Sequence, residues 1–319
     1  MIGGSIGEGV VEITPSGTPI YFQHDPRQYR VGPNIGTLDP LTAFELLAEV
    51  PDSVHQWGQV PSVSEVLDVL HKPGLPWWGM TTGVEGIQTL LSLNLAREIV
   101  VAQRPTLAVM GQEGEPAPAS TEQLVELLTR NQLTVNHVRD RAGDRGIAVH
   151  DAMQGWAETG RLPDPTIYAA AEAGYVRGLV RFLRDVEPEP IASEVMVASE
   201  HGYAGRYDLR LRVTRPRDVV AHIYPKKAPV IKTLRPGEIL TDLKSSKGVY
   251  ESHPRQLEAY EKASVESGWP ETVARGIIHV VEDGRYEFVR SWATFDDFLA
   301  VLGVWQSDQA MKKRKKQAA

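Results

Sequence analysis

ILTDLKSS, residues 239–246, is the stretch of the chain that decides the fold. It is short and largely apolar, which favours a β-strand. Alternate side chains of a strand share a face, so Asp242 and Lys244 point the same way. Leu243 then faces the core, while its backbone carbonyl can still reach an ion beside Asp242. Because hydrolysis of a phosphodiester by a divalent ion needs carboxylate oxygens and a nearby cation, we expect a strand over 238–246 with a metal site on one face.

A second carboxylate comes from the strand that we expect over 205–213. The residues expected on the core side of this strand alternate along it: Tyr207, Leu209, Leu211 and Val213. Asp208 lies on the opposite, open face, where it can act as a second metal ligand. Gly205 allows backbone or nucleic acid to approach closely.

Two helices supply further candidate side chains. His150 lies beside an apolar stripe on the helix expected over 145–159, where its imidazole can act as a third metal ligand. On the helix expected over 254–267, Gln256 and Tyr260 are four residues apart and therefore share a face. Each pattern is commonplace by itself, and the order of all of them along the chain carries the argument.

The remaining patterns predict a mixed α/β fold, in which a central β-sheet is flanked by helices. We divide the chain into an amino-terminal region over 1–140, mainly helical after residue 60, a core over 141–306 and a basic, disordered tail over 307–319. Other expected elements are strands and loops over 1–60, helices near 62–70, 84–99, 120–142, 165–185 and 295–306, and strands over 193–198, 275–281 and 285–292. Asp283-Gly284 between the last two strands predicts a hairpin turn.

Charge is distributed unevenly along the chain. The net charge is −7, yet residues 201–250 hold 11 Lys or Arg against 4 Asp or Glu, and residues 312–316 are all basic. The bulk of the chain is therefore acidic, while the stretch around the motifs is suited to bind phosphates. The chain contains no cysteine, which excludes disulfides, thiolate nucleophiles and cysteine-ligated iron–sulfur clusters. Because no apolar run is long enough to span a bilayer and no secretion signal is evident, we expect no membrane association and a cytoplasmic protein, in the host cytoplasm if phage-encoded.

Taken in order, these residues resemble the RecB-like branch of the PD-(D/E)XK nuclease superfamily, which includes phage exonucleases. The shared pattern is Gly146-x-x-Val149-His150, Glu194, Gly205-x-x-Asp208, Asp242-x-Lys244 and Gln256-x-x-x-Tyr260. The resemblance is specific over 145–260 and looser over 61–306. It implies a restriction-endonuclease-like core, and the spacing between Asp208 and Asp242, which is longer than the family's, implies an inserted hairpin.

The resemblance also implies roles for individual residues. Mg²⁺ or Mn²⁺ would be bound by His150, Asp208, Asp242 and the Leu243 carbonyl, and the iron–sulfur cluster of some relatives is excluded. Lys244 would activate the attacking water, while Gln256 and Tyr260 would hold DNA or brace Lys244. The expected catalytic side chains are thus Asp208, Asp242, Lys244, Gln256 and Tyr260. Those expected at the substrate are Glu194, Arg206, Lys226, Lys227 and Lys247.

By this resemblance the chain is a metal-dependent DNA exonuclease that serves phage or bacterial recombination, repair or replication. Its partners would be DNA and a recombination or single-strand-annealing protein, and residues 1–140 would guide DNA to the site. Two alternatives stay open: a structure-specific endonuclease of the same fold, and a catalytically inactive DNA-binding accessory protein.

Overall fold

The computed structural model describes residues 2–6, 9–24, 27–35, 57–70, 74–93, 121–222 and 227–318. The chain divides into two compact units, one formed by residues 1–70 and 146–319 and the other by residues 71–145. The expected amino-terminal region over 1–140 is therefore split between the two units, because residues 1–70 pack with the core.

The central element of the first unit is a five-stranded sheet with the strand order β12-β11-β10-β7-β6. Its strands are β6 (Glu189–Ser199), β7 (Tyr203–Val213), β10 (Gly237–Lys244), β11 (Ala274–Val280) and β12 (Tyr286–Arg290). Strands β10 and β11 are parallel, whereas the other neighbours are antiparallel. Parallel neighbours need a crossover, and helix α8 (Ser252–Glu266) supplies it. The predicted mixed α/β sheet is confirmed.

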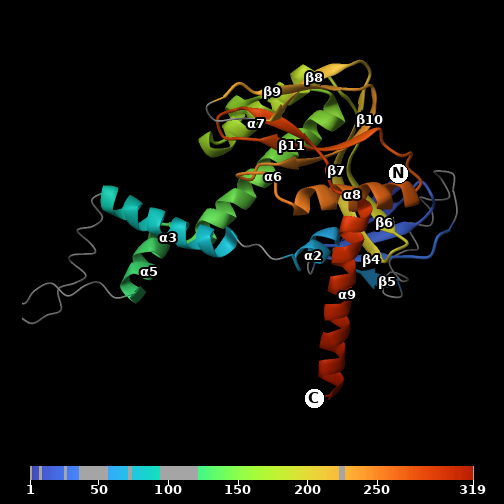
Figure 1. Ribbon diagram of the computed structural model, residues 1–319, viewed down its shortest axis with the longest axis horizontal. Helices are drawn as coiled ribbons and strands as arrows, with labels where there is room; N and C mark the ends of the chain where they lie inside the picture. Colours follow the sequence, from blue (N-terminus) through green and yellow to red (C-terminus); the bar gives the residue numbers. More distant parts are fainter. Residues whose placement is uncertain are drawn as a thin grey trace, which may run out of the picture. The chain divides into compact units, whose positions relative to one another are not determined.

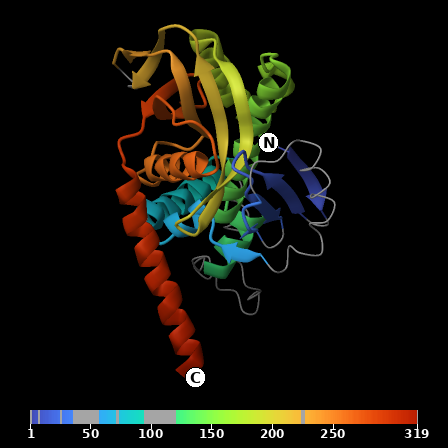
Figure 2. The same ribbon diagram turned by 90° about the vertical axis from the view of Figure 1, so that its right-hand side faces the viewer.

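Helices cover both faces of this sheet (Figures 1 and 2). Helices α6 (Val135–Thr159) and α7 (Ala170–Val186) pack on one face, with a short 3₁₀ turn, η2 (Pro165–Ile167), between them in the chain. On the other face lie α8, α2 (Val63–Leu67) and the first turns of α9 (Phe295–Ala318). Because each face has an apolar cover, successive residues of the strands are buried on both faces of the sheet.

The alternation of side chains between the two faces of the sheet is interrupted at one level of β6 and β7. Tyr207 belongs to the core under α8, whereas Leu209 belongs to the core under α6 and α7, although a regular strand would place both on one face. The expectation that Tyr207 and Leu209 share a core face is therefore wrong. Opposite them Glu194 has a φ of 52°, a left-handed conformation rare outside glycine. The break turns the backbone at Asp208 and Glu194 together.

An inserted hairpin separates β7 from β10, as the spacing predicts. Strands β8 (Arg217–His222) and β9 (Val230–Leu234) pair antiparallel as a separate two-stranded sheet. The other hairpin, β11–β12, turns at Asp283-Gly284, where Gly284 has a φ of 81° that suits glycine.

Residues 2–60 contribute a second five-stranded antiparallel sheet in the order β1-β2-β3-β4-β5. Its strands are β1 (Ile2–Ile6), β2 (Gly9–Ile13), β3 (Pro19–Gln23), β4 (Gln28–Val31) and β5 (Gly58–Val60). Ile20, Phe22 and Tyr29 pack against Met196 and Ala198 of β6. This sheet therefore covers the part of β6 that continues past Glu194.

The second unit is helical. It holds α3 (Gly74–Ser92), α5 (Thr121–Arg130) and the first turns of α6. The sequence predicts helices over 120–142 and 145–159, but the break falls at 131–134, where Gln132 has a φ of 57°. The Pro- and Gly-rich stretch 111–119 lies outside the described residues.

Helix α9 replaces the expected disordered tail. It runs to Ala318, although nothing after Leu302 is buried. Residues 309–318 are mostly strong helix formers, and the five basic residues lie at the carboxyl end, where cations favour the helix dipole. Lys312 also pairs with Asp308 one turn earlier, at 2.7 Å. Among the helices of the described ranges, none has both the length and the apolar character needed to cross a bilayer.

Candidate metal centre

The imidazole of His150 lies next to residues of three strands of the central sheet. Helix α6 buries Val149 and Met153, which leaves the adjacent His150 half-buried at the rim. Its Nδ1 lies 3.7 Å from both Asp208 Oδ2 and Glu194 Oε1. Its Nε2 lies 3.2 Å from the Leu243 carbonyl oxygen. One helix side chain thus reaches β6, β7 and β10 at the level where the alternation breaks.

His150, Glu194 and Asp208 form a group with the spacing of metal ligands. One ligand atom from each lies within 4.8 Å of the others. Asp208 is fixed independently, because its Oδ2 accepts the Leu243 backbone N–H at 2.7 Å. Glu194 is held in its left-handed conformation directly opposite, and such strained backbone concentrates at functional sites. The sequence predicts His150 and Asp208 as ligands and Glu194 at the substrate, so the geometry gives Glu194 a larger part than expected.

Asp242 and Lys244 face each other on β10. Asp242 is fully buried, and Lys244 Nζ lies 2.6 Å from its Oδ2. Within the described residues neither carboxylate oxygen has a hydrogen-bond partner, so Oδ2 has only the Lys244 ion pair and Oδ1 has no such contact. A buried carboxylate oxygen without a partner is costly. A cation at Oδ1 would remove that cost.

Gln256 and Tyr260 contact each other, as their spacing on one helix predicts. Gln256 Nε2 donates to the Tyr260 hydroxyl at 2.9 Å, and Tyr260 is buried. A Cβ at Gly205 would come within 2.5 Å of the Tyr260 ring. Gly205 is therefore required for the close approach of Tyr260, and not for the approach of nucleic acid.

The electrostatics of the site favour unusual protonation states. Burial alone lowers the pKa of His150, but the carboxylates of Asp208 and Glu194 outweigh it and raise that pKa to about 9. Burial raises the pKa of Asp242 to about 6, although Lys244 opposes the shift. For Lys244, burial lowers the pKa, but Asp242 and Asp208 outweigh it, so the net pKa is raised. Near neutral pH the cluster therefore holds an imidazolium and an ammonium among its carboxylates. A bound metal ion can take the place of these positive charges.

The basic residues expected at the substrate fall into two groups. Arg206 lies at the site, with its Nε 3.2 Å from Glu194 Oε2 and its guanidinium over the Phe22 ring. Lys247 is exposed in the loop that follows β10. Lys227 belongs to the inserted hairpin, between β8 and β9, and Lys226 lies outside the described residues.

Two histidines near the site have no signal in the sequence. His253, in the first turn of α8, is electrostatically coupled to Lys244 and Asp242, and burial followed by the Lys244 charge lowers its pKa to about 4. His279 on β11 is the cross-strand neighbour of Lys244. Both are brought to β10 by tertiary packing, which spacing along the chain does not reveal.

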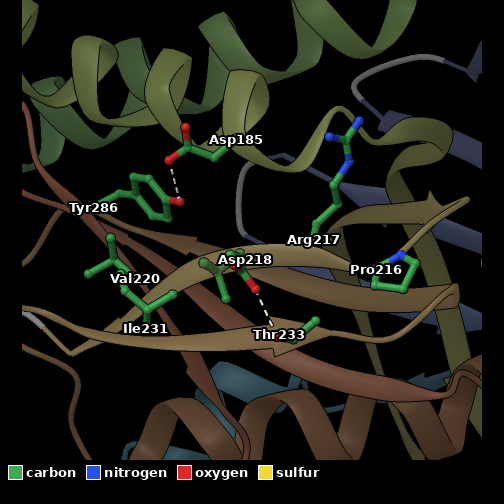
Figure 3. A pocket seen from close by; sticks show the side chains of 9 residues that line it. Asp185, Pro216, Arg217, Asp218, Val220, Ile231, Thr233 and Tyr286 are labelled. Atoms are coloured by element: carbon green, nitrogen blue, oxygen red, sulfur yellow. Dashed lines mark hydrogen bonds between the residues drawn. The ribbon is translucent and has the colours of Figure 1, made fainter.

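A pocket whose lining includes none of these site residues lies beside the β8–β9 hairpin (Figure 3). Its volume is about 580 Å³, and it is bounded by Asp185 of α7, the base of the β8–β9 hairpin and Tyr286 of β12. Tyr286 donates to Asp185 and Thr233 donates to Asp218, both at 2.7 Å. The pocket holds none of the residues predicted for chemistry. The candidate centre is instead the rim where α6 meets β6, β7 and β10.

The donor set fits a hard divalent cation. The two carboxylates and the imidazole come from β6, β7 and α6, and the Leu243 carbonyl of β10 lies beside the imidazole. Asp242, which the sequence predicts as a ligand, is not part of this group. Oxygen-rich sets with one imidazole suit Mg²⁺, Mn²⁺ and similar ions, whereas soft metals prefer thiolates. Since the chain has no cysteine, it offers no thiolate ligands for an iron–sulfur cluster.

No protein-family model matches the chain. No curated protein matches it either. The functional argument therefore depends on the geometry of this centre.

Proposed function

We propose that this chain is a divalent-metal-dependent deoxyribonuclease of the PD-(D/E)XK type, similar to the RecB-like branch. One observation carries the proposal: His150, Glu194 and Asp208 come within 4.8 Å of one another beside the strand that holds Asp242 and Lys244. Residues from four elements, spread over almost a hundred positions, meet at one point.

The order of elements supports the same reading. A helix with His150 precedes β6 and β7, β10 carries Asp-x-Lys, and α8 with Gln256 and Tyr260 leads to the parallel strand β11. This is the arrangement that the resemblance implies for a restriction-endonuclease-like core.

In the proposed mechanism, side chains of the protein bind the metal ion, orient the reacting groups and neutralise negative charge. A divalent ion bound here would polarise the phosphate and lower the pKa of water. Asp208 is held in place by the Leu243 N–H through Oδ2, the oxygen that also faces His150. His150 would hold the ion as a neutral imidazole, beside Glu194 and Asp208. Lys244, released from Asp242, supplies a fixed positive charge at the attacked phosphate.

DNA is the proposed substrate because basic residues surround the centre. Arg206 is in the site and Lys247 follows β10 directly. Lys226, Lys227 and the basic end of α9 would contact the phosphate backbone farther away, so binding should weaken steeply with salt. Action on DNA ends is the preferred reading, with Mg²⁺ or Mn²⁺ as the ion and a recombination or annealing protein as a possible partner.

A nuclease assay with three uniformly labelled DNA substrates tests the proposal: linear duplex, nicked circle and covalently closed circle, each with Mg²⁺ or with EDTA. An exonuclease degrades the linear duplex and spares the closed circle, whereas an endonuclease of the same fold attacks the circle. Binding without any magnesium-dependent cleavage would leave only the inactive accessory protein. His150→Asn should abolish cleavage, and Asp151→Asn, an exposed neighbour on the same helix, is the matched control.

A further inference from the structure

His279 makes two hydrogen bonds from a buried position beside the lysine strand. It lies on β11 and is only 4% exposed. Its Nδ1 is 2.9 Å from Glu287 Oε1 on the neighbouring strand β12. Its Nε2 is 2.8 Å from the backbone carbonyl oxygen of Ser246.

Both of these partners are acceptors. A neutral imidazole carries one N–H, so it can donate to one of the two oxygens only. An ionised carboxylate and a carbonyl have no proton to give. Satisfying both contacts therefore requires the doubly protonated imidazolium, with Glu287 as its counter-ion.

The bond to Ser246 acts on the loop that leaves the lysine strand. Lys244 and His279 are paired in the register of β10 and β11, and Ser246 follows two residues later. The Ser246 hydroxyl also donates to the Gly248 carbonyl at 2.8 Å. The loop 245–248, which presents Lys247, is thus anchored to β11 through one carbonyl.

The charged groups around His279 come from four elements. Glu287 of β12 is the direct partner, and its other oxygen lies 3.4 Å from His222 Nδ1 on β8. Lys244 is the neighbour on β10, and His253 on α8 is coupled to His279 but is held neutral by its pKa of about 4. Burial lowers the pKa of His279, but Glu287 and the Ser246 carbonyl outweigh it, so the net pKa is raised.

We propose that His279, kept as an imidazolium by Glu287, is a positioning residue that fixes the Ser246 carbonyl and with it the direction of Lys244 and the place of Lys247. The consequence for catalysis rests on the proposed nuclease function. The pair of contacts from His279 to Glu287 and to the Ser246 carbonyl, which we call the clamp, is a property of the fold. Loss of the proton at rising pH leaves one of the two oxygens without a donor. The loop then loosens without any change in the metal ligands.

Three measurements test the clamp. Nitrogen-15 histidine spectra should show both ring nitrogens of His279 protonated at pH 6. In His279→Leu, the amides of the loop 245–248 that are protected from hydrogen exchange in the unmodified protein should exchange about 10-fold faster or more, because the loop loses its anchor to β11, while the melting transition shows that the variant is folded. In Glu287→Gln, kcat should keep its value at low pH, and its alkaline limb should move down by about one pH unit.

The matched control is His222→Gln, which touches the same carboxylate without contacting Ser246 and should leave the alkaline limb in place. A neutral His279 at pH 6, unchanged exchange in folded His279→Leu, or a uniform loss of kcat at all pH values in Glu287→Gln would each overturn the inference. If the unmodified protein cleaves no DNA, the proposed function fails, whereas the spectra and the exchange rates still decide the clamp.

Discussion

Lys244 Nζ lies 2.6 Å from Asp242 Oδ2, so the ammonium of the predicted Asp-x-Lys pair neutralises the fully buried carboxylate of its own motif. The other oxygen of Asp242 has no hydrogen bond within the described residues. Asp242 therefore has one oxygen engaged by the lysine and one ready for a cation. In the proposed mechanism, a cation at the other oxygen would favour release of Lys244 from Asp242.

Replacing Lys244 with methionine should separate turnover from metal binding. The variant keeps the carboxylates but removes the fixed charge at the phosphate, so we expect kcat to fall by about 100-fold or more. Manganese affinity at pH 8, measured by calorimetry, should change much less than kcat, because His150, Glu194 and Asp208 are retained. Lys262→Met, a surface change on α8, is the control. Loss of both kcat and metal affinity in Lys244→Met would mean that the lysine has a structural role instead.

Metal binding should release a proton from His150. The carboxylates around His150 raise its pKa to about 9 against the burial that lowers it, and only the neutral imidazole is a ligand. Affinity for Mn²⁺ should therefore rise between pH 6 and pH 9. Titrations in buffers of different ionisation enthalpy should show close to one proton released at pH 7.5. A pH-independent affinity with no proton release would contradict this assignment of the ligand.

The metal-free protein should lose stability at alkaline pH through the same residue. The folded-state pKa of about 9 exceeds the ordinary histidine pKa of 6.5, so the stability that His150 contributes is complete below pH 6.5 and is lost as pH rises through 9. Since the side chain is partly exposed, we expect a loss on the order of 1–2 kcal/mol. Urea unfolding in EDTA at pH 6.5 and 9 measures it. The decrease in unfolding free energy between pH 6.5 and pH 9 should be smaller in His150→Asn. An equal decrease in that variant would mean that another residue causes it.

Two glycines of the sequence pattern should respond differently to alanine. At Gly205 the new methyl group would lie 2.5 Å from the Tyr260 ring and 3.2 Å from Val63, so Gly205→Ala should cost about 1–3 kcal/mol of unfolding free energy. At Gly146 the nearest atom to the added methyl is 3.9 Å away, and the position is inside α6. Gly146→Ala should therefore stabilise by up to about 1 kcal/mol. Equal effects in thermal melts would contradict this difference in packing.

Sequence patterns predict those parts of the core in which residues that are close in the sequence are also close in space. The β10 strand with Asp242 and Lys244, the i, i+4 contact of Gln256 and Tyr260, and the turn at Asp283-Gly284 are all determined within a few residues. The inserted hairpin follows from the spacing between Asp208 and Asp242, which is longer than in the family that the sequence resembles.

The parts that sequence reasoning misses depend on tertiary contacts. The break of alternation at Glu194 and Asp208 comes from two covered faces of one sheet, which a single strand's pattern does not reveal. His279 reaches Ser246 only because β11 is parallel to β10. The helical end of α9 was predicted as a disordered tail because its charges were weighed more than its helix formers.

The most direct test of the account compares the rate of magnesium-dependent cleavage of linear duplex DNA in Asp208→Asn with the rate in Asp218→Asn. Asp208 contacts the Leu243 amide and faces His150, whereas Asp218 lies on the inserted hairpin and bonds to Thr233. We predict that Asp208→Asn loses cleavage by at least about 100-fold, while Asp218→Asn cleaves like the unmodified protein. Equal cleavage by the two variants, or magnesium-independent cleavage by either, would contradict the metal centre proposed for this chain.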